Sequence, residues 1–237
     1  KLRKSVELDV VGASTVVADL AGQKVADLLL INDRDLSYAK LRFDNRSIAT
    51  LKTHLGKFDD ALARALCWAA IWDMHRDAEI SSADFIEIAL NGLAGESDDA
   101  IVNIVLAQLG TSVEAYTTDA NRNSYREKLA DGLWALTSSS APGSDLQLLI
   151  SRAFAINAHT EAQTANIRAL LNGSAPGLKV DTDLRWYFLI ALTERGATTK
   201  AELEAELAKD NTTTGNLAFE TCLAAMPTSD AKAYAFN

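Results

Sequence analysis

The sequence predicts a mainly α-helical protein, an antiparallel array of helices with a short β remnant at its N-terminus. Apolar residues recur every three or four positions from Asp44 onward, which is the period of an amphipathic helix. Before that point they alternate with polar residues, as in a half-buried strand. The 237 residues are 48% hydrophobic but include only 12 Gly and 3 Pro, a composition that suits packed helices.

Residues 1–43 are predicted to be the end of a β-sandwich domain. Val6, Leu8 and Val10 alternate with polar residues, and a later apolar run is followed by the turn formers Asn32 and Asp33. The predicted strands are residues 5–10, 15–20, 28–31 and 38–43. Because three or four short strands are too few to be stable alone, we expect this domain to be incomplete.

Residues 44–237 are predicted to form an α-helical C-terminal domain of ten or eleven helices. Residues 61–72 are apolar on nearly every side, which indicates a central buried helix. Helix-capping residues recur along the chain, namely Asp59 or Asp60, Ser81, Asp98, Asn121, Ser144, Thr160, Asp183, Thr199 and Thr213. Short loops favour antiparallel neighbours. Two helices with their turns span roughly 35 to 45 residues, so an α-α superhelix of the HEAT or armadillo kind is favoured over a closed bundle.

Charge and cysteine content exclude several classes of partner. The formal net charge of -9 argues against nucleic acid and anionic membranes, which select a basic face. No apolar run approaches the roughly 18 residues of a membrane span, and no signal peptide is present. Cys67 and Cys222 lie among apolar residues, so we expect two buried free thiols and a cytoplasmic protein.

No catalytic motif is present in the sequence. The three histidines, His54, His75 and His159, lack the i, i+4 spacing that places two imidazoles on one zinc ion. There is no Gly-x-Ser-x-Gly elbow for a nucleophilic serine and no glycine-rich phosphate loop. We therefore expect no catalytic residue and no metal ligand within this chain.

Two short polar clusters supply the candidate site residues, which are predicted to face a cavity or another domain. They are Asp73, Arg76 and Asp77 in the first cluster, and Asp181, Arg185 and Trp186 in the second. The first, with His75, would suit a metal or a substrate amine, but a helix end with local ion pairs is the favoured interpretation. In the second, Arg185 would receive a carboxylate. The favoured interpretation there is a cap by Asp183 and an ion pair between Arg185 and Asp181.

Residues 29–40, Leu-Leu-Ile-Asn-Asp-Arg-Asp-Leu-Ser-Tyr-Ala-Lys, resemble a junction in the aminopeptidase N family of zinc aminopeptidases, particularly its actinobacterial branch. In that family such a strand pair ends a β-sandwich and a large helical C-terminal domain follows. Further segments resemble the same family in the same order: residues 62–66, 72–74, 76–79, 142–145, 180–186, 225–228 and 231–233. The resemblance covers essentially the whole chain.

The resemblance implies a non-catalytic role within a larger enzyme. The family's Gly-x-Met-Glu-Asn loop and His-Glu-x-x-His zinc helix are absent from this sequence. They would lie in a catalytic domain N-terminal to residue 1, which would hold the zinc. The implied partners are that catalytic domain and, in the complete enzyme, peptide substrates whose access the helical domain controls. The alternative is a freestanding helical solenoid that binds a protein or peptide partner on its concave face.

Overall fold

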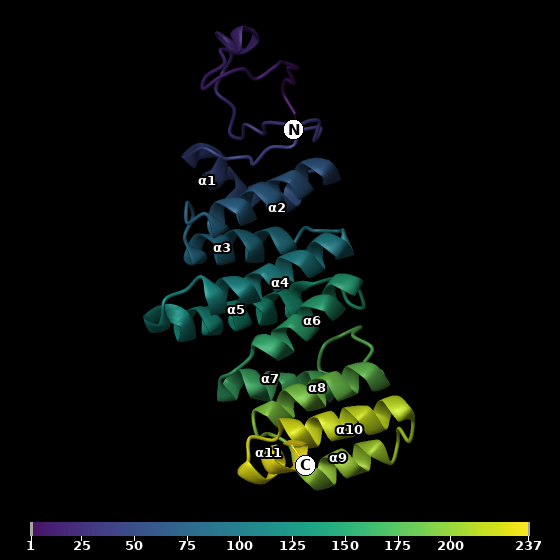
Figure 1. Ribbon diagram of the computed structural model, residues 1–237. Coiled ribbons are helices and arrows are strands. Elements are labelled where there is room, and N and C mark those ends of the chain that lie inside the picture. The colour runs from purple at the N-terminus through teal and green to yellow at the C-terminus, as the bar shows by residue number, and fades with distance from the viewer. Residues whose placement is uncertain (1, 237) are drawn as a thin grey trace.

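A computed structural model describes residues 2–236 and shows eleven α-helices stacked along one long axis (Figure 1). This confirms the mainly helical class. The helices are α1 (Asn45–His54), α2 (Ala61–Arg76), α3 (Ser82–Leu93), α4 (Asp99–Ala115), α5 (Asp119–Ser139), α6 (Asp145–Asn157), α7 (Glu161–Leu171), α8 (Thr182–Glu194), α9 (Lys200–Leu207), α10 (Thr213–Ala225) and α11 (Ser229–Phe236). No described helix is both long and apolar enough to span a membrane. Residues 1 and 237, the outer ends of the two predicted domains, lie outside the described part.

The helices form two layers. Each even-numbered helix from α2 to α10 contacts the next even-numbered one, and α1, α3 and α5 contact one another in the same way. We call α2, α4, α6, α8 and α10 the even-helix layer. Several helices adjacent in sequence also pack together, most extensively α5 with α6. The first helix and the last three therefore lie at opposite ends of the stack (Figure 1).

Side-chain caps begin most of these helices, as the sequence predicts. Thr160 makes a complete capping box with Gln163, which is the clearest of them. The other caps at predicted positions are Asp60, Ser81, Asp98, Ser144 and Thr199. Three predictions were wrong. Asp181 rather than Asp183 caps α8, Thr212 rather than Thr213 caps α10, and α5 begins at Asp119, ahead of Asn121.

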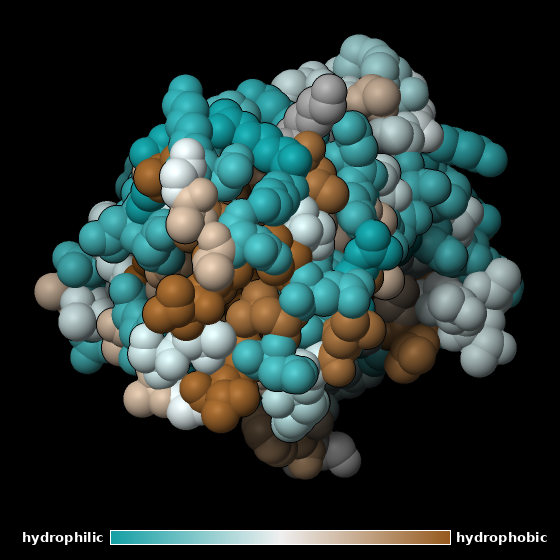
Figure 2. Space-filling view, turned by 90° about the horizontal axis from the view of Figure 1, so that it is seen from above, coloured by the Kyte–Doolittle hydropathy of each residue, from teal (hydrophilic) through white to brown (hydrophobic). Residues whose placement is uncertain are grey.

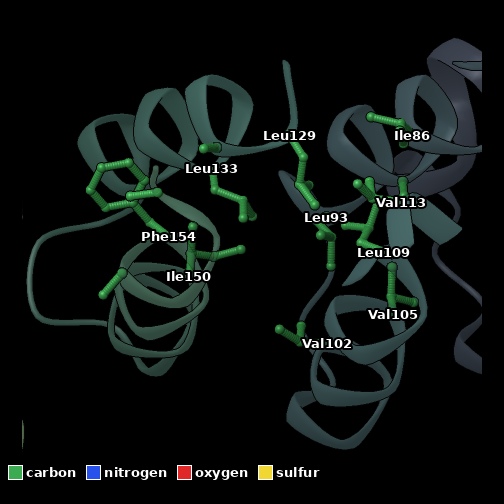
Figure 3. Close-up of a cluster of buried hydrophobic side chains, with 14 of the residues drawn as sticks. Ile86, Leu93, Val102, Val105, Leu109, Val113, Leu129, Leu133, Ile150 and Phe154 are labelled. Carbon is green, nitrogen blue, oxygen red and sulfur yellow. The ribbon is translucent and has the colours of Figure 1, made fainter. Parts of the chain in front are cut away.

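One hydrophobic cluster extends along the stack from Phe43 to Cys222. Figure 3 shows its central part, where Leu93 of α3 and Leu109 of α4 lie near Leu129 of α5, and Phe154 of α6 continues the row. All four side chains are almost fully buried. Because each helix from α1 to α10 contributes to this cluster, packing rather than intrinsic propensity holds these helices in place.

A buried ion pair joins the first helices. Arg64 of α2 and Glu96, in the loop before α4, are both nearly inaccessible to solvent and are joined by hydrogen bonds of 3.0 to 3.2 Å. The Trp68 indole N–H also donates to Glu96 at 3.0 Å. At the same place a Cβ on Gly95 would lie 2.2 Å from the Gly56 carbonyl oxygen, so this crossing requires glycine. The Arg64–Glu96 pair is therefore structural rather than available to a ligand.

The four predicted strands are not formed among residues 2–43, which is a correction to the β remnant. Residues 18–20, inside the second predicted strand, form a 3-10 turn instead. The segment's backbone hydrogen bonds close turns, such as Asp35 N–H to the Asn32 carbonyl, and make no ladder between strands. A strand needs a neighbour to receive its backbone hydrogen bonds, and these segments do not pair with one another. The surface at this end of the stack shows hydrophobic side chains among hydrophilic ones (Figure 2).

Candidate functional site

Four charged residues, Lys40, Arg42, Asp77 and Glu79, join the N-terminal segment to the turn between α2 and α3. We call them the Arg42 cluster. Lys40 Nζ lies 2.8 Å from the Asp77 carboxylate, and Arg42 bonds both Asp77 and Glu79, the latter at 2.7 Å. The Lys40 and Arg42 cations lower the pKa of Asp77. The partners of Asp77 thus lie 35 or more residues away along the sequence. The prediction of an ion pair within the first cluster was wrong.

The segment just before α1 is fixed by further contacts. Leu28, Leu30 and Leu41 pack against the hydrophobic core, and Phe43 is itself part of that core. The Ser47 hydroxyl accepts a 3.1 Å hydrogen bond from the Leu29 N–H. The part of the segment from residue 27 to residue 43 is therefore anchored on α1 and α2.

The remaining residues of the first cluster differ in their surroundings. Asp73 is half-buried on α2, whereas Arg76 is exposed at the end of that helix. His75 between them is buried, and its ring stacks on Phe85 with centroids 4.8 Å apart. The cluster therefore does not gather around one metal ion. A place for Asp73, Arg76 and Asp77 at a cavity or domain boundary stays a prediction.

His75 is a structural residue and not a general base. Its Nδ1 lies 3.2 Å from the Ile80 carbonyl oxygen and its Nε2 lies 2.9 Å from the Ser112 hydroxyl. Burial lowers the pKa of His75, so the ring is neutral. Although a Ser–His pair of this length resembles a nucleophile and its base, Ser112 is completely buried and no substrate reaches it.

The second cluster ties α8 to α9 and to the loop before α10. Arg185 donates to both Glu206 carboxylate oxygens, at 2.5 and 2.9 Å, and Lys209 lies 3.0 Å from the same group. The Trp186 indole N–H donates to Asp210 at 2.8 Å. The ion pair expected between Arg185 and Asp181 is not formed; the Asp181 side chain instead accepts from the Leu184 N–H.

These bonds fix the charge state of Glu206. Hydrogen bonding by Arg185 is the main cause that lowers the pKa of Glu206 to about 2. The carboxylate is nearly inaccessible to solvent, so it holds Arg185 in one orientation. The carboxylate that Arg185 binds therefore belongs to the same chain, to Glu206. That Asp181, Arg185 and Trp186 lie near a cavity or another domain stays a prediction.

The even-helix layer includes an arginine, Arg152, that no pattern in the sequence singles out. The Arg152 guanidinium of α6 lies over the Tyr187 ring of α8, 5.5 Å from its centroid. Its Nε is buried without a hydrogen-bond partner in the described part of the chain, as is Oε1 of Gln108 on α4. Only their place in the fold singles these residues out, because neither belongs to a motif.

The same layer exposes apolar side chains. Within α1 to α10, the large apolar residues with high exposure in the described structure are Leu62, Ile104, Ile156 and Leu217, and all four belong to even-numbered helices. Exposed apolar side chains on the same layer as an arginine with an unpartnered Nε are typical of an interaction face.

The residues present do not fit a catalytic zinc ion. Within residues 2–236, no group of three or more His, Cys, Asp or Glu side chains gathers in a way that would hold a metal. Both ring nitrogens of His75 are already engaged, and the two cysteines are buried free thiols, as predicted. No chemical step is therefore assigned to a metal in this chain.

Comparison with known proteins identifies two similarities. The family model described as ERAP1-like C-terminal domain matches residues 28–237. Aminopeptidase N from Streptomyces lividans is 41% identical over 234 residues, which make up 98% of this chain and 27% of that relative. The chain thus spans about a quarter of the length of the curated relative it matches.

Proposed function

This chain belongs to the ERAP1-like C-terminal domain family, and from that membership we propose that it acts as the non-catalytic C-terminal region of a zinc-dependent aminopeptidase. The main support is a similarity to aminopeptidase N that extends over 98% of the chain. The lack of a zinc-binding motif in the sequence agrees with a catalytic centre supplied by another part of the enzyme.

We propose that the two layers of helices form a HEAT-like superhelix whose even-helix layer faces the catalytic part. Contacts between successive even-numbered helices make this layer continuous, which supports the assignment. The exposed side chains of Ile104 and Ile156 and the unpaired cation of Arg152 would border the space through which peptides enter. The layer would thereby restrict access by peptide length.

The domain division is part of the same proposal. Residues 1–43 would belong to a neighbouring β domain, where strands of that domain would pair with them. Val10 and Val16 are 72% and 89% exposed, which is costly for valine unless another surface covers them. The Arg42 cluster would then fix the orientation of the helical stack relative to that domain.

Activity of the isolated chain provides the first test. The purified 237-residue chain should not hydrolyse an amino-acid anilide, with or without added zinc, because residues 2–236 include no group of side chains that would hold the ion. Zinc-dependent turnover by the pure chain would refute the non-catalytic assignment.

Substrate length provides the second test, in the complete enzyme. Arg152→Ala should change kcat/KM for peptides of ten or more residues at least threefold and leave the turnover of an amino-acid anilide unaltered. Lys128→Ala is the matched control, since it removes one positive charge from an exposed position of α5 in the other layer. Equal effects of the two variants on long peptides would contradict an access role for the even-helix layer.

A further inference from the structure

A pocket of about 280 Å³ lies beside the turn between α2 and α3, and we call it the Arg76 pocket. The ends of four helices meet there: the last residues of α2 and α4 and the first turns of α3 and α5. The side chains used below are Arg76, Ala78, Ile80, Tyr116, Asn121 and Tyr125. None of these residues is among Ile104, Arg152 and Ile156, on which the proposed function depends.

The charge of this pocket differs from that of the rest of the chain. The lining includes the Arg76 guanidinium and no aspartate or glutamate, although the chain as a whole has a net charge of -9. Three acids close to the pocket in sequence are already paired: Asp77 with Lys40, Glu79 with Arg42, and Asp119 with Arg122 at 2.5 Å. The electrostatic character of the pocket therefore favours an anion.

Several polar groups of the pocket have no partner within the described structure. The side chains of Arg76 and Asn121 form no hydrogen bond and no ion pair there. The hydroxyls of Tyr116 and Tyr125 likewise have no partner among residues 2–236. One guanidinium, one amide and two phenol hydroxyls thus remain as donors around a single small space. A carboxylate accepts from all three kinds of donor.

Aromatic contacts hold the Tyr116 ring in place at the pocket. The centroid of the Tyr116 ring lies 5.9 Å from that of Trp72, in an edge-on contact, and 5.3 Å from that of His75. The His75 ring is itself held by Ser112 and stacked on Phe85. A ring fixed on one side presents its other atoms to the pocket without a further loss of rotamer freedom. The position of the Tyr116 ring is therefore fixed before any ligand enters.

The ligand class follows from charge and size. One cation with neutral donors suits a single negative charge better than a doubly charged phosphate. The volume is just below the roughly 300 Å³ at which small-molecule pockets begin, and Ala78, Ile80 and the tyrosine rings supply apolar walls. We propose that the Arg76 pocket binds a small monocarboxylate, with the carboxylate at Arg76 and its apolar part against the tyrosines.

Two matched probes test this on the 237-residue chain. N-acetyl-L-leucine has a carboxylate and N-acetyl-L-leucinamide replaces it with a neutral amide. In ¹H–¹⁵N spectra at pH 7, titration with the acid should produce saturable shifts at residues 76–80 and 116–121, and the amide should bind at least tenfold more weakly. Equal affinities, or shifts located elsewhere, would overturn the proposal.

Variants then assign the cation. Arg76→Gln should weaken binding of N-acetyl-L-leucine at least tenfold, whereas Arg34→Gln, which changes the net charge equally at an exposed position that does not line the pocket, should not. Tyr125→Phe removes one hydroxyl and should weaken binding two- to fivefold. Wild-type affinity in Arg76→Gln would overturn the assignment. Because neither probe is a peptide substrate, failure here would leave the aminopeptidase proposal to its own tests.

Discussion

Replacement of Glu206 by glutamine measures the contribution of the α8–α9 ion pair to stability. The pKa of Glu206 is about 2, against an ordinary value of 4.5. A tenfold difference in proton affinity corresponds to about 1.4 kcal/mol, so the folded state favours the charged form by about 3 kcal/mol. Because Glu206 is nearly inaccessible to solvent, Glu206→Gln should lower the free energy of unfolding at pH 7 by about that amount.

The pH dependence gives the sharper test. A carboxyl whose pKa is lowered by folding stabilises the protein above its unfolded pKa, and this contribution is lost as pH falls from 4.5 towards 2. Glutamine does not titrate. The difference in free energy of unfolding between wild type and Glu206→Gln should therefore narrow to about 2 kcal/mol at pH 3.5.

Urea unfolding followed by far-UV circular dichroism at both pH values measures this difference. Glu204→Gln is the control, since Glu204 is on the same helix but exposed and pairs with Lys200 only at 3.8 Å. A loss of stability that is the same at pH 7 and pH 3.5, or one that Glu204→Gln reproduces, would refute the reasoning.

Three further predictions concern other parts of the stack. Phe154→Ala should lower the free energy of unfolding by about 3 to 5 kcal/mol, measured in urea, because Phe154 is fully buried. Burial lowers the pKa of His75, so stability should fall as pH decreases below the unfolded value near 6.5; in His75→Gln, urea midpoints at pH 7 and pH 5.5 should differ less than in wild type. Asp77→Asn should speed amide hydrogen exchange at residues 40–43, and 1 M salt should have a similar effect on wild type, because the pairs with Lys40 and Arg42 are partly exposed. Unchanged exchange in Asp77→Asn would mean that apolar contacts alone hold the segment.

Local signals in the sequence were sufficient for the helices but not for the contacts between them. The sequence predicts the Thr160 cap because its partner Gln163 is only three residues away. By contrast, Arg185 was assigned to Asp181 because that acid is close in sequence, whereas its partner Glu206 is on the next helix. Helix packing decides which acid reaches the guanidinium, and no short pattern encodes that choice.

The β remnant and Arg152 illustrate two other limits. Alternating residues such as Val6, Leu8 and Val10 describe how a strand would bury one face, but a strand forms only when a neighbour completes its hydrogen bonds. Arg152 has no distinctive neighbours in sequence and stands out only because α6 and α8 bring it over Tyr187. Strand formation and the position of Arg152 both depend on residues that are distant in the sequence.

The two buried thiols lie near opposite ends of the stack, Cys67 on α2 and Cys222 on α10 (Figure 1). Burial raises the pKa of Cys67 to about 12 and that of Cys222 to about 11, so neither forms a reactive thiolate at neutral pH in the closed structure. Alkylation of each thiol therefore reports the local opening of its own end. The ratio of the two alkylation rates distinguishes a stack that opens as a single cooperative unit from one whose ends fray independently.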